Sequence, residues 1–230
     1  FVFANFNGTS GDVDVITHEC GHAFQGYLSA KDPIREHADI GMETAEIHSM
    51  SMEFFTEPWY GLFFEGKTGC MVDEFQHRIY DNPELTPDER KAVWKELEQI
   101  YKPHQDYGAL AFYAKGCYWQ RQHHIYELPF YYIDYALAQI CAFQFFERSK
   151  KEPEKAWGDY YRLCQAGGSK GYFALLELAG LKNPFVDGTV EEVVAGLKPY
   201  LKRKVKYTIR PVKEEDLKKV AEVEALCFPA

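Results

Sequence analysis

Two histidines four residues apart, His18 and His22, restrict the possible folds of this chain more than any other pattern in it. In an α-helix, positions four apart lie about one turn apart on one face, so both imidazoles can hold the same metal ion. Glu19 lies partly off that face, where its carboxylate can act as a general base but is badly placed to replace a histidine. The pattern predicts a helix that carries a catalytic zinc site.

The alternative interpretation is a pair of solvated surface histidines. The neighbouring residues argue against it, because a largely buried helix would make unpaired histidine and glutamate costly. These neighbours are Val13, Val15, Ile16, Ala23 and Phe24. Cys20 lies roughly 200° around the helix from His18, so we interpret it as a small core residue that faces away from the metal.

A catalytic zinc site uses three protein ligands, so a third ligand is needed besides the histidines. A second predicted helix carries Glu43, Glu46 and Glu53, which fall along one stripe together with Met50. Three carboxylates on one stripe require a cation, and this helix is therefore expected to supply the third ligand. An ordinary solvated charge remains the alternative for Glu53.

With these residues, the chain resembles the oligoendopeptidase F branch of the thimet oligopeptidase family of zinc metallopeptidases. The resemblance rests on residues 1–12, on the histidine helix, on residues 46–53 and on residues 124–135. It implies a mainly α fold, a helical zincin-like peptidase half with a small N-terminal β element near the active-site helix. It also implies a zinc-dependent metalloendopeptidase that hydrolyses internal peptide bonds of oligopeptides.

The resemblance assigns roles to individual residues. It implies one Zn²⁺ per chain, with His18, His22 and Glu46 as ligands and Glu19 as the general base. Glu43 and Glu53 then correspond to carboxylates that orient the histidines or hold the ligand helix, a support that metal sites generally need.

The tyrosine-rich segment fits the same chemistry, because amide hydrolysis places negative charge on the former carbonyl oxygen. By the resemblance, His124, Tyr132 and Tyr135 bind the substrate backbone and the transition state, with Tyr131 as a neighbour. Two alternatives stay open here: His123 could be the functional histidine, and the aromatic side chains could simply form core.

Two other functions are compatible with the pattern. A Taq-type metallocarboxypeptidase also uses a helical fold and a similar histidine helix with a downstream glutamate, but it releases only C-terminal residues. Alternatively, the chain is a truncated zinc-binding fragment without turnover. Members of the family are much longer, and we expect the missing N-terminal half, which closes one wall of the substrate cleft, to be needed.

Composition favours a cytoplasmic enzyme. The net charge of −9 argues against nucleic acid. No apolar run is long enough to cross a membrane, and the first residues do not resemble a signal peptide, so we expect neither a membrane segment nor a secretion signal. The six cysteines show no CxxC pair, so reduced thiols are expected. Oligopeptide substrates are therefore the expected partners, with no nucleic acid and no membrane.

Two regions are predicted, a zinc metallopeptidase catalytic region at 1–204 and a strand–helix tail at 205–230. The tail resembles the truncated start of a GNAT acyltransferase domain, with an ordinary strand and helix as the alternative. Residues 1–7 are expected to form a strand whose edge could pair with substrate. Helices are expected from about 13 onward and near 42–57, 70–81, 86–101, 105–122, 130–149, 153–166, 170–179 and 189–202.

Overall fold

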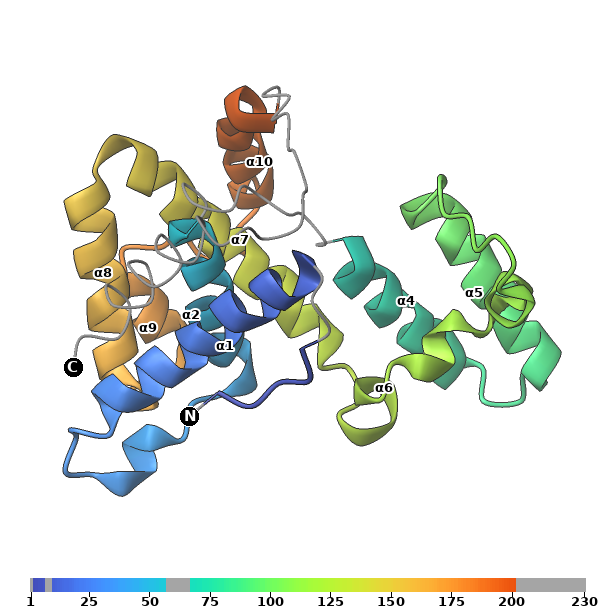
Figure 1. Ribbon diagram of the computed structural model, residues 1–230, viewed down its shortest axis with the longest axis horizontal. Coiled ribbons are helices and arrows are strands. Elements are labelled where there is room, and N and C mark those ends of the chain that lie inside the picture. The colour runs from blue at the N-terminus through green and yellow to red at the C-terminus, as the bar shows by residue number, and fades with distance from the viewer. Residues whose placement is uncertain (1, 7–9, 57–66, 202–230) are drawn as a thin grey trace, which may run out of the picture. The chain divides into compact units, whose positions relative to one another are not determined.

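The computed structural model describes residues 2–6, 10–56 and 67–201, and these form a mainly helical fold, as predicted (Figure 1). The α-helices are α1 (Ser10–Ser29), α2 (Met42–Phe55), α4 (Lys67–Asp81), α5 (Pro87–Tyr101), α6 (His124–Glu127), α7 (Tyr132–Lys151), α8 (Pro153–Ala166), α9 (Tyr172–Leu178) and α10 (Thr189–Leu201). Short helical turns of other types lie at Arg35–Ala38, Tyr113–Cys117 and Tyr118–Arg121.

The expected N-terminal β element is not present in the described residues. Residues 2–6 form no regular secondary structure, and no strand occurs anywhere in the described part of the chain. A strand needs a neighbour to satisfy its main-chain groups, and the described residues offer none. The side chains of Phe3 and Phe6, whose apolar character suggested a strand, are instead exposed.

The single helix expected over 105–122 is also wrong. Residues 105–110 are not helical, and helical structure resumes only at residue 111, just before the π-helical segment Tyr113–Cys117. Gly108 and Gly116 both adopt positive φ, which an ordinary helix cannot accommodate. At Gly116 the chain passes so close to α5 that a Cβ atom would lie 2.3 Å from the Lys91 carbonyl oxygen.

Helix α5 shows how local sequence fixes a boundary. The Thr86 side chain accepts a hydrogen bond from the Glu89 amide, and the Glu89 carboxylate accepts one from the Thr86 amide. This capping box, followed by Pro87 at the first helical position, satisfies the free donors at the helix start. The predicted start near 86 is therefore confirmed.

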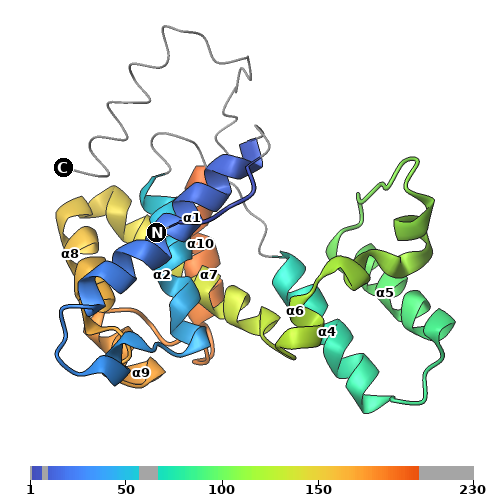
Figure 2. The same ribbon diagram turned by 60° about the horizontal axis from the view of Figure 1, so that its bottom comes forward.

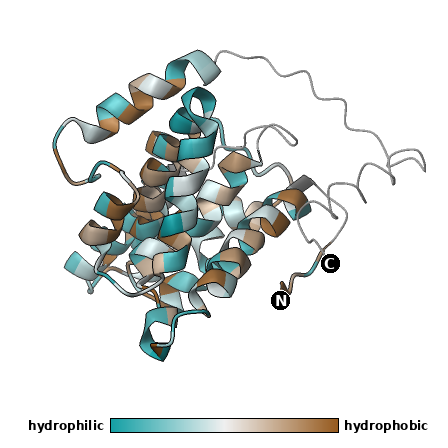
Figure 3. Cartoon of the chain, turned by 90° about the vertical axis from the view of Figure 1, so that its left-hand side faces the viewer, coloured by the Kyte–Doolittle hydropathy of each residue, from teal (hydrophilic) through white to brown (hydrophobic). Residues whose placement is uncertain are grey.

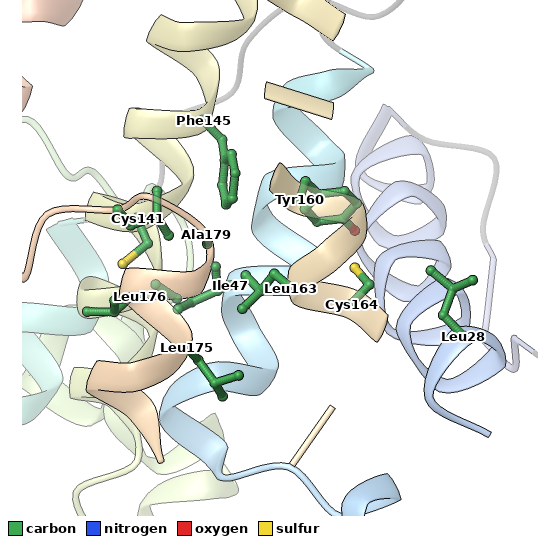
Figure 4. Packing of buried hydrophobic residues seen from close by; sticks show 12 residues of the cluster. Leu28, Ile47, Cys141, Phe145, Tyr160, Leu163, Cys164, Leu175, Leu176 and Ala179 are labelled. Carbon is green, nitrogen blue, oxygen red and sulfur yellow. The ribbon is translucent and has the colours of Figure 1, made fainter. Parts of the chain in front are cut away.

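Helix α7 connects two hydrophobic clusters, because it packs against α2 on one stretch and against α4 on another. The first cluster joins α1, α2, α7, α8 and α9 through fully buried residues such as Ile47, Phe145 and Tyr160 (Figure 4). The second joins α4 and α5 around Trp94 and includes Tyr132 from the start of α7. Apolar and polar residues alternate along the helices, as this packing requires (Figure 3).

By its contacts the chain divides into Phe1–Lys198 and Pro199–Ala230. The predicted boundary at 204/205 and the predicted strand–helix tail at 205–230 lie outside the described residues. No helix in the described ranges is long and apolar enough to span a membrane. None of the five cysteines that the structure describes forms a disulfide.

Candidate metal centre

Helices α1 and α2 lie side by side and bring the two predicted histidines against the predicted glutamate (Figure 2). The Nε2 atoms of His18 and His22 lie 3.2 and 3.6 Å from Oε2 of Glu46. One ligand atom from each of these three residues lies within 4.8 Å of the others. The structure therefore brings together, across a helix crossing, the three side chains that the resemblance implies as zinc ligands.

Gly21 explains why the crossing is close enough. A Cβ atom at this position would lie 2.6 Å from the Ser49 Cα and 2.7 Å from the His48 carbonyl oxygen, both backbone atoms of α2. Only glycine allows the two helix backbones to approach this far. Because Gly21 directly precedes His22, this close contact brings the histidine helix against α2 at the position of the metal-binding residues.

The donor set fits zinc. Two imidazole nitrogens and one carboxylate oxygen are ligands that catalytic zinc uses, and three protein ligands leave one position open. In a tetrahedral site with bonds of about 2.0–2.1 Å, neighbouring donor atoms lie about 3.3 Å apart. The two distances from Glu46 Oε2 to the histidine nitrogens, 3.2 and 3.6 Å, bracket that value.

Glu53 holds His18 from the other side. Its Oε1 lies 2.6 Å from Nδ1 of His18, which leaves Nε2 to face the centre. Burial lowers the pKa of His18, but hydrogen bonds and charges from Glu46 and Glu53 outweigh it and raise the pKa to about 10. A carboxylate on the far nitrogen is a recurrent support of zinc-bound histidines, and Glu53 occupies that place as expected.

The electrostatics of the other two donors also suit a cation. Burial lowers the pKa of His22, which favours the neutral imidazole that binds metals. Burial tends to raise the pKa of Glu46, but hydrogen bonds from His18 and Tyr131, with the charges of the histidines, lower it to about 2. Glu46 is thus a buried carboxylate, only 4% exposed, that stays ionised.

No hydrogen bond or ion pair joins Glu43 to His18 or His22 within the described residues, and the contacts of these histidines run to Glu46 and Glu53. Glu43 lies near Asp134, whose pKa rises to about 6, first through burial and then through the charge of Glu43. It also contributes to the raised pKa of Tyr172. On α2, Glu46 and Glu53 therefore contact the histidines, whereas the charge of Glu43 acts on Asp134 of α7 and on Tyr172 of α9.

Glu19 lies beside the three donors without joining them. No hydrogen bond occupies its carboxylate within the described residues, and its side chain is partly exposed. Its charge acts on His22 of the same helix and on Tyr135 near the start of α7. A free carboxylate in this place can accept a proton.

The residues expected to stabilise negative charge differ in their surroundings. His124 lies within reach of the charge of Glu46, whereas the hydroxyl of Tyr132 is already bound to another side chain. The His124 ring lies 5.6, 5.8 and 6.4 Å from the rings of Tyr131, Tyr132 and Tyr135, and the charge of Glu46 acts on it. His123 is exposed, so the geometry favours His124. The Tyr132 hydroxyl donates to Oε1 of Gln122 at 2.6 Å and lies in the second hydrophobic cluster.

Two side chains at the centre were not predicted in the role they take. The Tyr131 hydroxyl donates to Oε1 of Glu46, and the Ser49 hydroxyl donates to Oε2 at 2.9 Å. Ser49 could have been found, since it follows Glu46 by three residues on the same helix. The contact of Tyr131 joins residues 85 apart in sequence, and no local pattern indicates it.

Comparisons with known proteins show which structures and which family this chain resembles. No match was found among curated proteins. A structure of Pz peptidase A with an inhibitor is 50% identical to this chain, with a TM-score of 0.80 over 87% of this chain and 39% of the other. An X-ray structure assigned as oligoendopeptidase F is 48% identical, with a TM-score of 0.81 over 90% and 39%.

A further structure, assigned as oligoendopeptidase F from Bacillus anthracis str. Ames, is 45% identical, with a TM-score of 0.71 over 87% of this chain and 36% of the other. The chain thus spans less than two fifths of the length of these relatives. The model of peptidase family M3 matches residues 1–62 and 68–195. The chain therefore belongs to peptidase family M3.

Proposed function

We propose that this chain is the metal-bearing part of a zinc-dependent endopeptidase that hydrolyses internal bonds of oligopeptides. The observation that carries the proposal is the convergence of His18, His22 and Glu46 within 4.8 Å of one another, next to the free carboxylate of Glu19. A site with three ligands and an adjacent base is the arrangement that metal-assisted hydrolysis needs.

His18 and His22 would hold zinc through Nε2, and Glu46 through Oε2. Glu53 would keep His18 in the tautomer that presents Nε2, because its carboxylate engages the hydrogen on Nδ1. Zinc, when bound, would supply a Lewis acid that polarises a peptide carbonyl and makes water easier to deprotonate.

Glu19 would move the proton. Its carboxylate would take a proton from the attacking water and deliver it to the nitrogen of the leaving amine, so the residue ends the cycle ionised. Its partly exposed position allows water and the peptide to reach it.

His124 and Tyr135 would donate hydrogen bonds to the oxygen that gains negative charge. Burial lowers the pKa of His124 and raises that of Tyr135 to about 12, so at neutral pH the first is neutral and the second keeps its proton. Tyr132 belongs to the same proposal from the resemblance, although its hydroxyl already donates to Gln122. The support for Tyr135 is therefore stronger than that for Tyr132.

Substrate class and the need for further protein also belong to this proposal. The relatives are described as peptidase and oligoendopeptidase, and this chain matches under two fifths of each. We infer that the remainder of the domain completes the substrate cleft. A zinc-binding fragment without turnover is the second candidate, favoured by that partial coverage.

Cleavage of internally quenched peptides, with products identified by mass, tests the proposal. Internal cuts that disappear with a chelator and return with zinc are expected. Release of C-terminal residues alone would contradict an endopeptidase. A folded chain that binds zinc and makes no cut would favour the second candidate.

A further inference from the structure

Tyr131 occupies the carboxylate oxygen of Glu46 that faces away from the histidines. Its hydroxyl donates to Oε1, whereas Oε2 faces the Nε2 atoms of His18 and His22. Both Tyr131 and Glu46 are buried, at 7% and 4% exposure. A buried carboxylate without donors would be costly, so this contact also stabilises the charge of Glu46.

A phenol carries a single hydrogen, so a hydroxyl that donates to Glu46 cannot donate to a substrate oxygen at the same time. This separates Tyr131 from Tyr135, although the two rings lie only 4.9 Å apart. Tyr135 shows no such bond to a carboxylate within the described residues and is partly exposed, although its hydroxyl interacts with that of Tyr131. Two neighbouring tyrosines thus serve different purposes.

The orientation of the Glu46 carboxylate follows from its two donors. Ser49 donates to Oε2 from the same helix, and Tyr131 donates to Oε1 from the start of α7. A rotation that turned both oxygens toward the histidines would break the bond to Tyr131. We propose that Tyr131 is a positioning residue that fixes Glu46 so that it offers the metal one oxygen, Oε2. This inference rests on the proposed zinc site.

The turn before α7 supports this role. Phe130 has φ +65°, the sole non-glycine residue with positive φ in the described ranges, and such strain persists only where surrounding contacts impose it. Its ring lies 4.8 Å from that of His77 and 5.1 Å from that of Tyr80, both on α4. These contacts hold the turn that presents Tyr131 to Glu46.

The test compares Tyr131→Phe with Tyr101→Phe in the full chain. Tyr101 is a matched control, because its hydroxyl also donates to a carboxylate, Oε2 of Glu74 at 2.7 Å, away from the metal centre. Zinc affinity is measured by competition with a chromophoric chelator. Tyr131→Phe is expected to bind zinc about 10–100-fold more weakly, the usual loss when the support of a ligand is removed. Tyr101→Phe is expected to match the wild type.

Two further measurements distinguish a positioning role of Tyr131 from a direct catalytic role. With cobalt in place of zinc, the visible spectrum of Tyr131→Phe should change, because Glu46 becomes free to offer both oxygens. At zinc concentrations that saturate the variant, peptide turnover should return nearly to the wild-type value, whereas Tyr135→Phe should stay slow. A turnover defect that persists at saturating zinc with an unchanged cobalt spectrum would overturn the positioning role.

Phe130→Gly provides a second variant, since glycine accepts the positive φ but loses the ring contacts. It should weaken zinc binding in the same direction. If Tyr131→Phe fails to fold, wild-type zinc affinity in Phe130→Gly overturns the inference by itself. Absence of zinc binding in the wild type would instead refute the proposed function. Normal wild-type binding with no difference between Tyr131→Phe and Tyr101→Phe would refute only the positioning role.

Discussion

Replacing Gly21 with alanine should both destabilise the fold and weaken the metal centre. The added Cβ would lie 2.6 Å from a backbone atom of α2, which is 0.8 Å closer than the 3.4 Å of ordinary contact. Neither helix backbone can yield without moving the crossing. The matched control is Gly26→Ala on the same helix, because a Cβ there would meet nothing within 4 Å.

The magnitudes follow from two opposing effects. Alanine favours a helix interior over glycine by about 1 kcal/mol, so Gly26→Ala should stabilise by about that amount. At Gly21 the same gain is opposed by overpacking of up to about 3 kcal/mol, which leaves a net loss of about 2 kcal/mol. The two variants should then differ by about 3 kcal/mol, or roughly 6–12 °C in melting temperature.

The effect on zinc has a geometric origin. Relieving the clash requires the helices to separate by up to about 0.8 Å, which would move the histidines away from Glu46. Metal–ligand distances tolerate deviations of only about 0.2 Å. Zinc affinity of Gly21→Ala should therefore fall by about tenfold or more. Thermal unfolding of the metal-free proteins and chelator competition provide the two readouts. A Gly21→Ala variant that is as stable as Gly26→Ala and binds zinc normally would refute the role of this crossing.

Three other substitutions test single contacts. Glu53→Ala removes the partner of His18 Nδ1 and should weaken zinc binding about 10–100-fold by chelator competition; unchanged affinity would rule out its support of the histidine. Tyr135→Phe should lower kcat by about 10²-fold or more with little change in KM, since one donor to the developing charge is lost. A change confined to KM in steady-state kinetics would contradict that role. Arg148→Ala breaks the hydrogen bonds from this guanidinium to Asp159 and to the carbonyl of Ala179. The free energy of unfolding, measured with a chemical denaturant, should fall by about 3–5 kcal/mol, because Asp159 is left buried and only partly paired. A loss under about 1 kcal/mol would show that these bonds are dispensable.

The expected site residues that the structure brings together were chosen from helical periodicity or from the family resemblance. The spacing of His18 and His22 fixes their common face locally, so the tertiary structure adds little. The choice of Glu46 over Glu43 came from the resemblance. In the structure the Glu46 carboxylate lies next to both histidines, whereas the charge of Glu43 acts on Asp134 of α7.

The incorrect or missing predictions involve contacts between distant segments. The expected strand at 1–7 rested on apolar content, which cannot show whether a partner strand exists. The helix expected over 105–122 ignored the positive φ that the approach to α5 imposes on Gly116. Similarly, the bond between Tyr131 and Glu46 joins residues 85 apart in sequence and follows a turn with positive φ at Phe130, and no sequence pattern indicates either feature.

The most direct test of the central claim measures zinc content and peptide cleavage together in two variants. Glu19→Gln should keep one zinc per chain and lose hydrolysis, because it keeps the three ligands and removes the base. Glu46→Ala should lose both, because two histidines alone hold zinc weakly. Wild-type turnover in Glu19→Gln, or a full zinc complement in Glu46→Ala, would contradict the assignment of this centre.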